Sequence, residues 1–227
     1  MRLGATSEIE KLEREIVARL TSLPSTSVGE VRRVRREFSV RIRTLPAEFV
    51  NQLAFELLSN SSAPRFFAYE LVQHHGEAAA SLNSRTIQLL GKGIDSWDSV
   101  DSFACYLSGP AWREHQLSDS LIAKWTRSKN RWWRRAAVVS TVPLNNKARG
   151  GRGDAERTIQ ICRLVVDDRD DMVVKALSWA LRELSKRNKG VVESFLSENE
   201  SRLAPRVLRE VRNKLRTGLK NSKVRGT

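Results

Sequence analysis

The stretch that decides the fold is Trp132-Trp133-Arg134-Arg135-Ala136-Ala137, because a similar stretch follows it 40 positions later in the chain. The second copy reads Met172-Val173-Val174-Lys175-Ala176-Leu177, and Phe66-Phe67-Ala68 fits the same template. In both copies the apolar and basic residues recur at helical spacing. Two helical segments that repeat at a fixed interval indicate a protein built from stacked helical units.

Helical signals continue on both sides of this repeat, and convincing strand alternation is absent. A period near 40 with two helices per unit is typical of HEAT and armadillo repeats, in which each pair buries its faces against its neighbours. The sequence therefore predicts an all-α fold, a curved solenoid of HEAT-like helical pairs, with a compact helical bundle as the alternative. From capping residues and Pro or Gly breaks we expect helices over 7–20, 27–38, 46–57, 64–75, 83–90, 96–107, 110–126, 130–142, 154–166, 171–187, 191–196 and 205–219.

These helices are expected to form a single repeat domain over residues 1–219, followed by a basic, disordered tail over 220–227. Asn145-Asn146-Lys147-Ala148-Arg149-Gly150-Gly151-Arg152-Gly153 interrupts the helical pattern. Its composition predicts a flexible, basic surface loop whose arginines either contact DNA or keep the loop soluble.

The charge of the chain favours a polyanionic partner. Lys and Arg number 40 against 26 Asp and Glu, which gives a net charge of +14, and nucleic acid is a more natural partner for such a chain than an anionic membrane. No apolar run approaches the ~18 residues of a membrane span, and the first helix is studded with charges, unlike a signal peptide. We therefore expect a cytoplasmic protein.

The cysteines and histidines give no sign of a metal or a cofactor. Cys105 and Cys162 are far apart and belong to no CxxC pair, so they are expected to be buried free thiols. His74, His75 and His115 lack metal-ligand spacing. We expect no metal site and no cofactor.

Ser96-Trp97-Asp98-Ser99-Val100-Asp101-Ser102-Phe103 contains the first candidate site. Ser96 is a good N-cap, and Val100 and Phe103 begin a buried stripe. Trp97 and Asp101 then lie one turn apart on the flank of that stripe. They are either a core-edge Trp beside a solvated Asp or an aromatic ring and a carboxylate at the edge of a binding groove.

Basic side chains accompany aromatic ones on other helices. Trp179 is expected opposite the core stripe of its helix, in a row with Lys175, Arg182 and Lys186. Such a row is typical of a nucleic-acid surface, although Trp and Arg are also enriched at protein–protein hot spots. Other cations that could track or clamp phosphates are Arg131 and Arg135, one turn apart, and Arg32, Arg33, Arg35 and Arg36 on the helix after Ser27. Arg135 beside a core stripe would pair with an acid or hold a phosphate bidentately.

Three motifs together resemble the AlkD-type DNA alkylation repair family. They are residues 96–102, Asn130-Arg131-Trp132-Trp133-Arg134-Arg135-Ala136-Ala137, and Lys175-Ala176-Leu177-Ser178-Trp179-Ala180-Leu181-Arg182-Glu183. The resemblance spans residues 94–215. It implies a HEAT-like solenoid that holds duplex DNA and a monofunctional glycosylase that removes N3- or N7-alkylated purines. By matched position it implies Asp101 as the catalytic carboxylate, Trp97 and Trp179 as aromatics against the lesion, and Arg135 as a phosphate clamp.

The chemistry agrees with elementary principles. An alkylated N3 or N7 makes the purine cationic and already a good leaving group, so one carboxylate can stabilise the sugar cation and place a water. The sequence thus predicts a monomeric glycosylase acting on alkylated double-stranded DNA in base excision repair. A non-catalytic protein that binds damaged or branched DNA is the alternative, and a basic protein–protein scaffold is a third.

Overall fold

The structure, a computed structural model, describes residues 2–59 and 63–221, with side chains from residue 7 onward. Over this part of the chain every regular element is a helix, which confirms the predicted all-α class. The chain forms two compact units, residues 1–93 and 94–227. The single domain over 1–219 stays a prediction. Most of the tail expected at 220–227 lies outside the described residues.

The first unit is built on two pairs of helices and two short ones. The contacts of α3 with α4, α1 with α3, and α2 with α4 bury its apolar faces. Phe67, Leu53 and Val34 lie in this core. The bounds of its helices are α1 Arg2–Thr21, α2 Val28–Ile42, α3 Ala47–Ser59, α4 Arg65–Gln73, α5 Gly76–Ala80 and α6 Ser84–Leu90.

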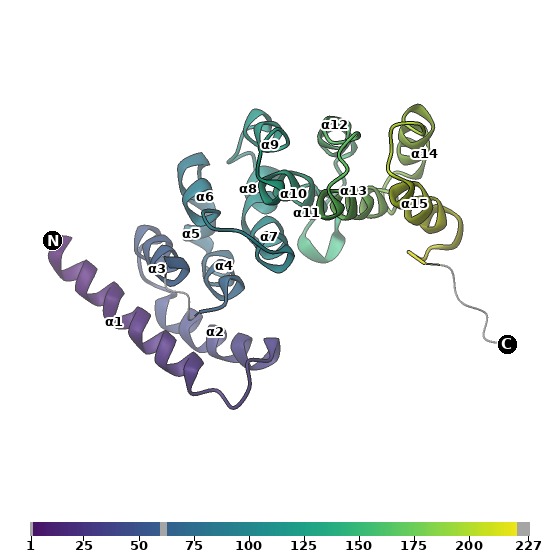
Figure 1. Cartoon of the computed structure of the whole chain (residues 1–227). Coiled ribbons are helices and arrows are strands. Elements are labelled where there is room, and N and C mark those ends of the chain that lie inside the picture. The colour runs from purple at the N-terminus through teal and green to yellow at the C-terminus, as the bar shows by residue number, and fades with distance from the viewer. Residues whose placement is uncertain (1, 60–62, 222–227) are drawn as a thin grey trace. The chain divides into compact units, whose positions relative to one another are not determined.

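The second unit stacks its helices in two rows (Figure 1). The first row is α7 Trp97–Phe103, α10 Arg131–Val139, α13 Asp171–Leu184 and α15 Pro205–Thr217, in which each helix packs against the next. The second row is α9 Asp119–Trp125, α12 Ala155–Leu164 and α14 Lys189–Glu198. The remaining elements are the π-helical η1 Ala104–Ser108, α8 Gly109–Arg113, α11 Val142–Asn145 and the 3₁₀ turn η2 Lys147–Arg149.

Several expected helix boundaries are wrong. Helix α1 begins before Ser7, so Ser7 is not its N-cap. Gly76 does not end a helix but begins α5, whose amide of Ala78 is capped by the Nδ1 atom of His75. Pro143 does not end the helix after Asn130, which stops at Val139, but lies near the start of α11. Gly76 and Pro143 thus belong to the start of the next helix and not to the end of the previous one.

The helix expected over 110–126 is wrong in its extent, since α8 ends at Arg113, although Pro110 does lie in the first turn of α8. This proline lies inside a continuous helical segment, α7–η1–α8, in which the amide of Gly109 donates to the carbonyl of Ala104. This wider π turn accommodates a proline, which has no N–H and whose ring would clash with the preceding turn of an α-helix. The separate helix α9 follows at Asp119.

The segment 145–153, expected to be flexible, is ordered by arginine side chains from α8 and from the turn after α13. Arg113 donates to the carbonyl of Arg149 (Nη1–O 2.6 Å), and Arg187 donates to the carbonyls of Asn145 (Nε–O 2.8 Å) and Gly151 (Nη2–O 2.6 Å). The side chain of Asn145 is itself buried. The glycines and basic residues of this segment predicted a flexible loop. The arginines that hold it are distant in the sequence, so the local composition does not reveal them.

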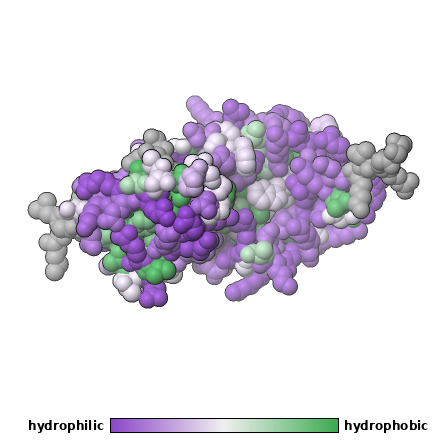
Figure 2. All heavy atoms as spheres, turned by 90° about the horizontal axis from the view of Figure 1, so that it is seen from below, coloured by the Kyte–Doolittle hydropathy of each residue, from purple (hydrophilic) through white to green (hydrophobic). Residues whose placement is uncertain are grey.

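The surface shown in Figure 2 is largely hydrophilic, in keeping with the high charge of the chain. Few large apolar side chains are exposed among the described residues, and Trp97 is one of them. Within residues 2–59 and 63–221, no helix has both the length and the hydropathy that crossing a membrane requires.

We predict that Gly109→Ala destabilises the second unit. A Cβ atom at this position would lie 2.7 Å from the Ser140 carbonyl oxygen and 2.7 Å from Cγ of Pro143. Relieving such overlaps typically costs about 1–3 kcal/mol. Gly190→Ala is the control, since the nearest atom to its Cβ would be Oδ1 of Asn188 at 4.0 Å. Thermal unfolding should show a lower Tm for Gly109→Ala alone; equal Tm values for the two variants would contradict the close helix contact.

Candidate functional site

An ion pair between Asp101 and Arg135 forms the centre of the candidate site. Nε of Arg135 donates to Oδ1 of Asp101 at 2.9 Å, and Nη2 donates to Oδ2 at 2.8 Å. The third nitrogen, Nη1, donates to the backbone carbonyl of Met172 at 2.5 Å. The guanidinium of Arg135 therefore connects α7, α10 and α13. Of the two roles that the sequence allowed for Arg135, the structure shows the pairing with an acid.

Local interactions at both helices hold this pair in place. Ser96 and Ser99 start α7, with the amide of Ser96 donating to Oγ of Ser99 at 3.2 Å. Two residues after Asp101, Phe103 packs edge-on against Trp133, with ring centroids 5.8 Å apart. Trp125 of α9 completes the cluster at 4.8 Å from Trp133. Trp133 therefore has a packing role, and this cluster shows why α7 meets α10 in a fixed register.

The Asp101 carboxylate keeps part of its surface in contact with solvent. Its side chain is 19% exposed, whereas that of Arg135 is 7% exposed. Trp97 lies one turn before Asp101 on the same face of α7, and 59% of its surface is exposed. The structure therefore places a solvent-accessible, oriented carboxylate next to an exposed indole ring.

Burial raises the pKa of Asp101 above the ordinary value of an aspartate, and the hydrogen bonds and positive charge of Arg135 oppose that rise. A second cation, Arg149, also favours the ionised carboxylate. Arg149 stacks over the ring of Tyr106 with 5.3 Å between its guanidinium carbon and the ring centroid. The sequence analysis missed Arg149 as a neighbour of Asp101, since it lies in the segment expected to be a flexible loop.

The α13 residues form a stripe that begins where Arg135 is anchored. Lys175 and Trp179 are one turn apart on this helix, and Lys186 is two turns beyond Trp179. Trp179 is half-buried, whereas the pattern predicted an exposed ring. Among the described residues, neither Trp97 nor Trp179 takes part in the hydrogen bonds of the Asp101–Arg135 pair. The convergence of all four side chains stays a prediction.

The other predicted DNA-binding cations of the second unit are paired with acids. Lys175 contacts Asp171 at 2.6 Å, Lys186 contacts Glu183 at 2.8 Å, and Arg131 contacts Asp170 at 3.4 Å while stacking on Trp132. The two lysines and Arg131 remain well exposed in these pairs. Arg182 differs, since it is largely buried and donates from Nε to Oγ of Ser178 at 3.2 Å. Burial lowers its pKa.

The four arginines of α2, expected as possible phosphate contacts, differ in burial and in their acidic partners. Arg35 is buried and pairs with Glu70 at 3.3 Å, and the Glu70 side chain is only 3% exposed. Arg32 pairs with the same carboxylate at 2.7 Å, and Arg33 pairs with Glu30 and Glu37 on its own helix. Arg36 is exposed. Glu70 explains the difference, because its position in α4 brings an acid beneath α2 that helix periodicity alone does not reveal.

Cysteine and acidic residues form no cluster suited to a metal. In the described part of the chain, no group of three or more His, Cys, Asp or Glu side chains could hold a metal ion. Cys105 and Cys162 are buried free thiols, and burial raises the pKa of each to about 12. Thiols in this state are poor nucleophiles at neutral pH.

The fold and the site define a helical-repeat protein that carries a paired carboxylate on one row of its helices. Residues 24–215 match the family of DNA alkylation repair enzymes, and the chain belongs to that family. This membership supports a role in the repair of alkylated DNA.

A solved structure of a predicted DNA alkylation repair enzyme from Enterococcus faecalis is similar to the chain, with a TM-score of 0.67 and 18% sequence identity. The similarity covers 84% of this chain and 87% of that chain. At this identity the likeness shows the fold, and it agrees with the predicted helical solenoid. No curated protein matches the chain.

We predict that Asp101→Asn lowers the free energy of unfolding, because the buried Arg135 loses the charge that compensates its own. The sequence alone suggested a flank carboxylate with little effect on stability. Hydrogen bonds to charged groups typically contribute about 1.5–3 kcal/mol. Denaturant unfolding measures the loss.

Asp168→Asn is the matched comparison for this prediction. Asp168 accepts from Nε of Arg134 at 2.7 Å, and its side chain is 14% exposed, close to the value for Asp101. The two variants should therefore lose similar stability. A normal unfolding free energy for Asp101→Asn would show that the pair contributes little to the fold.

Proposed function

We propose that the protein is a monofunctional DNA glycosylase that hydrolyses the N-glycosidic bond of N3- or N7-alkylated purines in duplex DNA. Asp101 is the proposed catalytic carboxylate, and Trp97 and Trp179 are the proposed aromatic contacts. The observation that carries the proposal is the solvent-accessible Asp101 carboxylate, fixed by Arg135 and next to the exposed Trp97. The family membership supports DNA as the substrate.

The proposed reaction needs one anionic group. As the bond between C1′ and the purine nitrogen breaks, its electron pair goes to the purine and cancels the positive charge left by alkylation. The sugar becomes an oxocarbenium ion, and a water oxygen then bonds to C1′ while the water proton leaves. A carboxylate beside C1′ stabilises the sugar cation and orients the water, and no general acid is required for the departing base.

The pairing with Arg135 leaves Asp101 able to act in this way. Each carboxylate oxygen accepts one hydrogen bond from Arg135, and each has a second lone pair for a water or for the developing charge. Both hydrogen bonds fix the orientation of the carboxylate before the substrate arrives, which is the arrangement that makes electrostatic stabilisation effective. Arg135 is thus proposed mainly as a positioning residue for Asp101. Its expected contact with a phosphate is the less important of its two proposed roles.

The aromatic and basic side chains are proposed to hold the DNA around this carboxylate. Exposed indole rings stack on sugars and bases and attract cations through their π-faces. Lys175, Lys186 and Arg131 exchange their acidic partners for phosphates on the same row of helices. Arg182 is proposed to support this surface from beneath, since it is largely buried.

One observation favours the alternative, a non-catalytic protein that binds damaged DNA. Arg135 neutralises the charge of Asp101 at short range, and a neutralised carboxylate stabilises a neighbouring cation less than a free one does. Release of free base from methylated duplex DNA separates the two functions, because the binding protein would retain such DNA without releasing 7-methylguanine or 3-methyladenine.

We predict that Asp101→Asn removes most base excision while duplex DNA binding is kept. Loss of a single electrostatic element that stabilises a transition state typically lowers the rate ~10²–10³-fold. Single-turnover release of methylated purines, with enzyme in excess, measures the chemical step without interference from product release. Trp97→Ala and Trp179→Ala should lower the rate less, since the rings exclude water and position the DNA.

Asp168→Asn controls for the loss of an Arg–Asp pair, here between α10 and the loop before α13, and should excise at the unmodified rate. Assays are run well below the Tm of both variants. If Asp101→Asn excised methylated purines as fast as the unmodified protein, Asp101 would not be catalytic and the proposed mechanism would be wrong.

The excision rate should also fall at acidic pH, because the reaction needs the ionised Asp101. Burial raises the pKa of Asp101 above its ordinary 3.8, so the acid limb of the rate profile lies above that value. Arg135 lowers this pKa, and Arg135→Gln should therefore shift the limb to higher pH. Arg134→Gln, which disturbs the neighbouring pair, should leave the limb in place; a limb that moves equally in both variants would exclude Asp101 as its cause.

A further inference from the structure

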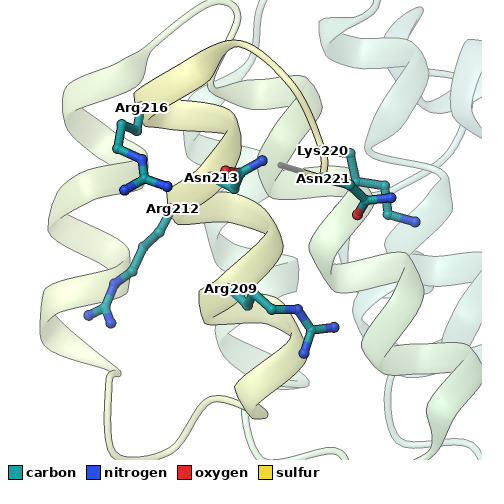
Figure 3. A pocket seen from close by; sticks show the side chains of 6 residues that line it. All are labelled: Arg209, Arg212, Asn213, Arg216, Lys220 and Asn221. Carbon is teal, nitrogen blue, oxygen red and sulfur yellow. The ribbon is translucent and has the colours of Figure 1, made fainter. Parts of the chain in front are cut away.

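The last helix of the chain carries a basic pocket that the proposed catalytic site does not use. The pocket has a volume of about 390 Å³ and is lined by Arg209, Arg212, Asn213, Arg216, Lys220 and Asn221. Arg212 and Arg216 lie on one side of α15 in Figure 3, Arg209 and Lys220 lie on the other, and Asn213 is between them. All six lining residues are polar or charged, and four are cations.

The chain builds this pocket by folding back after α15. Gly218 ends the helix in the left-handed conformation, with φ of 74°. The buried side chain of Asn213 donates from Nδ2 to the carbonyl of Leu219 at 2.9 Å. Lys220 then returns toward Glu210, with 3.6 Å between Nζ and Oε1. Helix periodicity thus groups the three arginines, and the fold-back after Gly218 adds Lys220 and Asn221 to them.

Acidic groups only partly balance these cations. Arg212 pairs with Glu200 at 2.7 Å, and Glu210 is shared by Lys220 with Ser178 and Arg182. Arg209 and Arg216 are exposed, and within residues 2–59 and 63–221 no ion pair holds either of them. Two guanidinium groups thus stay available, and a guanidinium is well shaped to bind a phosphate through two hydrogen bonds.

The charge of the chain is concentrated in the same region. Residues 201–227 contain nine Lys or Arg and one Glu, a net charge of +8 out of +14 for the whole chain. A terminal repeat needs only a polar outer surface to stay soluble. Helix α1 has such a mixed surface, since residues 7–21 contain four Glu and three Lys or Arg. Helix α15 instead carries five Lys or Arg and one Glu, Glu210, an excess of positive charge typical of a nucleic-acid contact.

We propose that this C-terminal pocket binds the phosphate backbone of duplex DNA outside the lesion, and that it supplies affinity without regard to damage. The inference rests on DNA as the ligand in the proposed function, and it does not depend on base excision. Arg209 and Arg216 are the proposed phosphate contacts, with Arg212 and Lys220 adding positive charge. An anionic membrane is a poorer fit, because no apolar side chain lines the pocket.

Arg209→Gln/Arg216→Gln, in the full chain, tests this proposal. Binding to an undamaged duplex and to the same duplex containing 7-methylguanine is measured over a range of salt concentrations. Each lost phosphate contact lowers the slope of log K against log salt by about 0.9, so the double variant should lose about 1.8. Near 0.1 M salt, one decade below 1 M, a slope loss of 1.8 corresponds to roughly 60-fold weaker binding to both duplexes.

Lys124→Gln/Arg127→Gln is the matched control, since it removes two exposed cations at the end of α9, in the second row of helices. It should change the salt slope much less, and thermal unfolding checks that both double variants are folded. Should the protein excise methylated purines, the single-turnover rate at saturating enzyme should be unchanged in Arg209→Gln/Arg216→Gln. A protein without excision activity would still show the loss of slope, so the two proposals fail separately.

Three results would overturn the pocket proposal. They are an unchanged salt slope in Arg209→Gln/Arg216→Gln, a loss no larger than that of the control variant, and a loss of binding to phosphatidylserine-containing vesicles while duplex binding is kept. The last result would assign the pocket to a membrane surface.

Discussion

The second unit depends on the guanidinium of Arg135, which joins three consecutive helices of one row. Two of its nitrogens bind both oxygens of Asp101 on α7, and the third binds the carbonyl of Met172 on α13. A planar, rigid fork of donors suits this task, since a lysine could not reach the three acceptors with fixed geometry. Because Arg135 is buried, it must keep its carboxylate partner, since a buried cation without one carries a large desolvation cost. The helices therefore stack in the one register that pairs these groups.

Pairs of this kind recur along the chain at the interval of the repeat. Asp101 and Arg135 are 34 residues apart, and so are Arg134 and Asp168. Arg163 on α12 and Glu198 on α14, both in the second row, are 35 residues apart. The Asp101–Arg135 and Arg163–Glu198 pairs join nearly equivalent positions of successive repeats, whereas Asp168 lies in the loop before α13. The interval of 40 read from the sequence holds between α10 and α13, where segment 145–153 lengthens the repeat.

Sequence alone predicted the helical class, most of the helices and the main candidate residues, because these follow from local patterns. Asp154 and Asp170 cap helices as expected, and Val173, Leu177 and Leu181 are buried as the periodicity requires. The errors arose where distant residues decide the outcome. Glu70 turns Arg35 inward, and Arg187 orders a loop that looked flexible. From the sequence, Arg135 could either pair with an acid or hold a phosphate. The stacking of α7 against α10 brings Asp101 to Arg135 and forms the pair.

The resemblance between the Asp101–Arg135 and Asp168–Arg134 pairs shows what a catalytic proposal must explain. Both are short, partly buried, and separated by 34 residues, so geometry and burial alone do not distinguish chemistry from architecture. Their surroundings differ. Asp168 shares Arg134 with the carbonyls of Ser128 and Lys129, which close the site with backbone. Asp101 instead has Trp97 exposed one turn away and Arg149 near its carboxylate. The exposed indole of Trp97 beside Asp101, and not the ion pair, makes Asp101 the better candidate for chemistry on DNA.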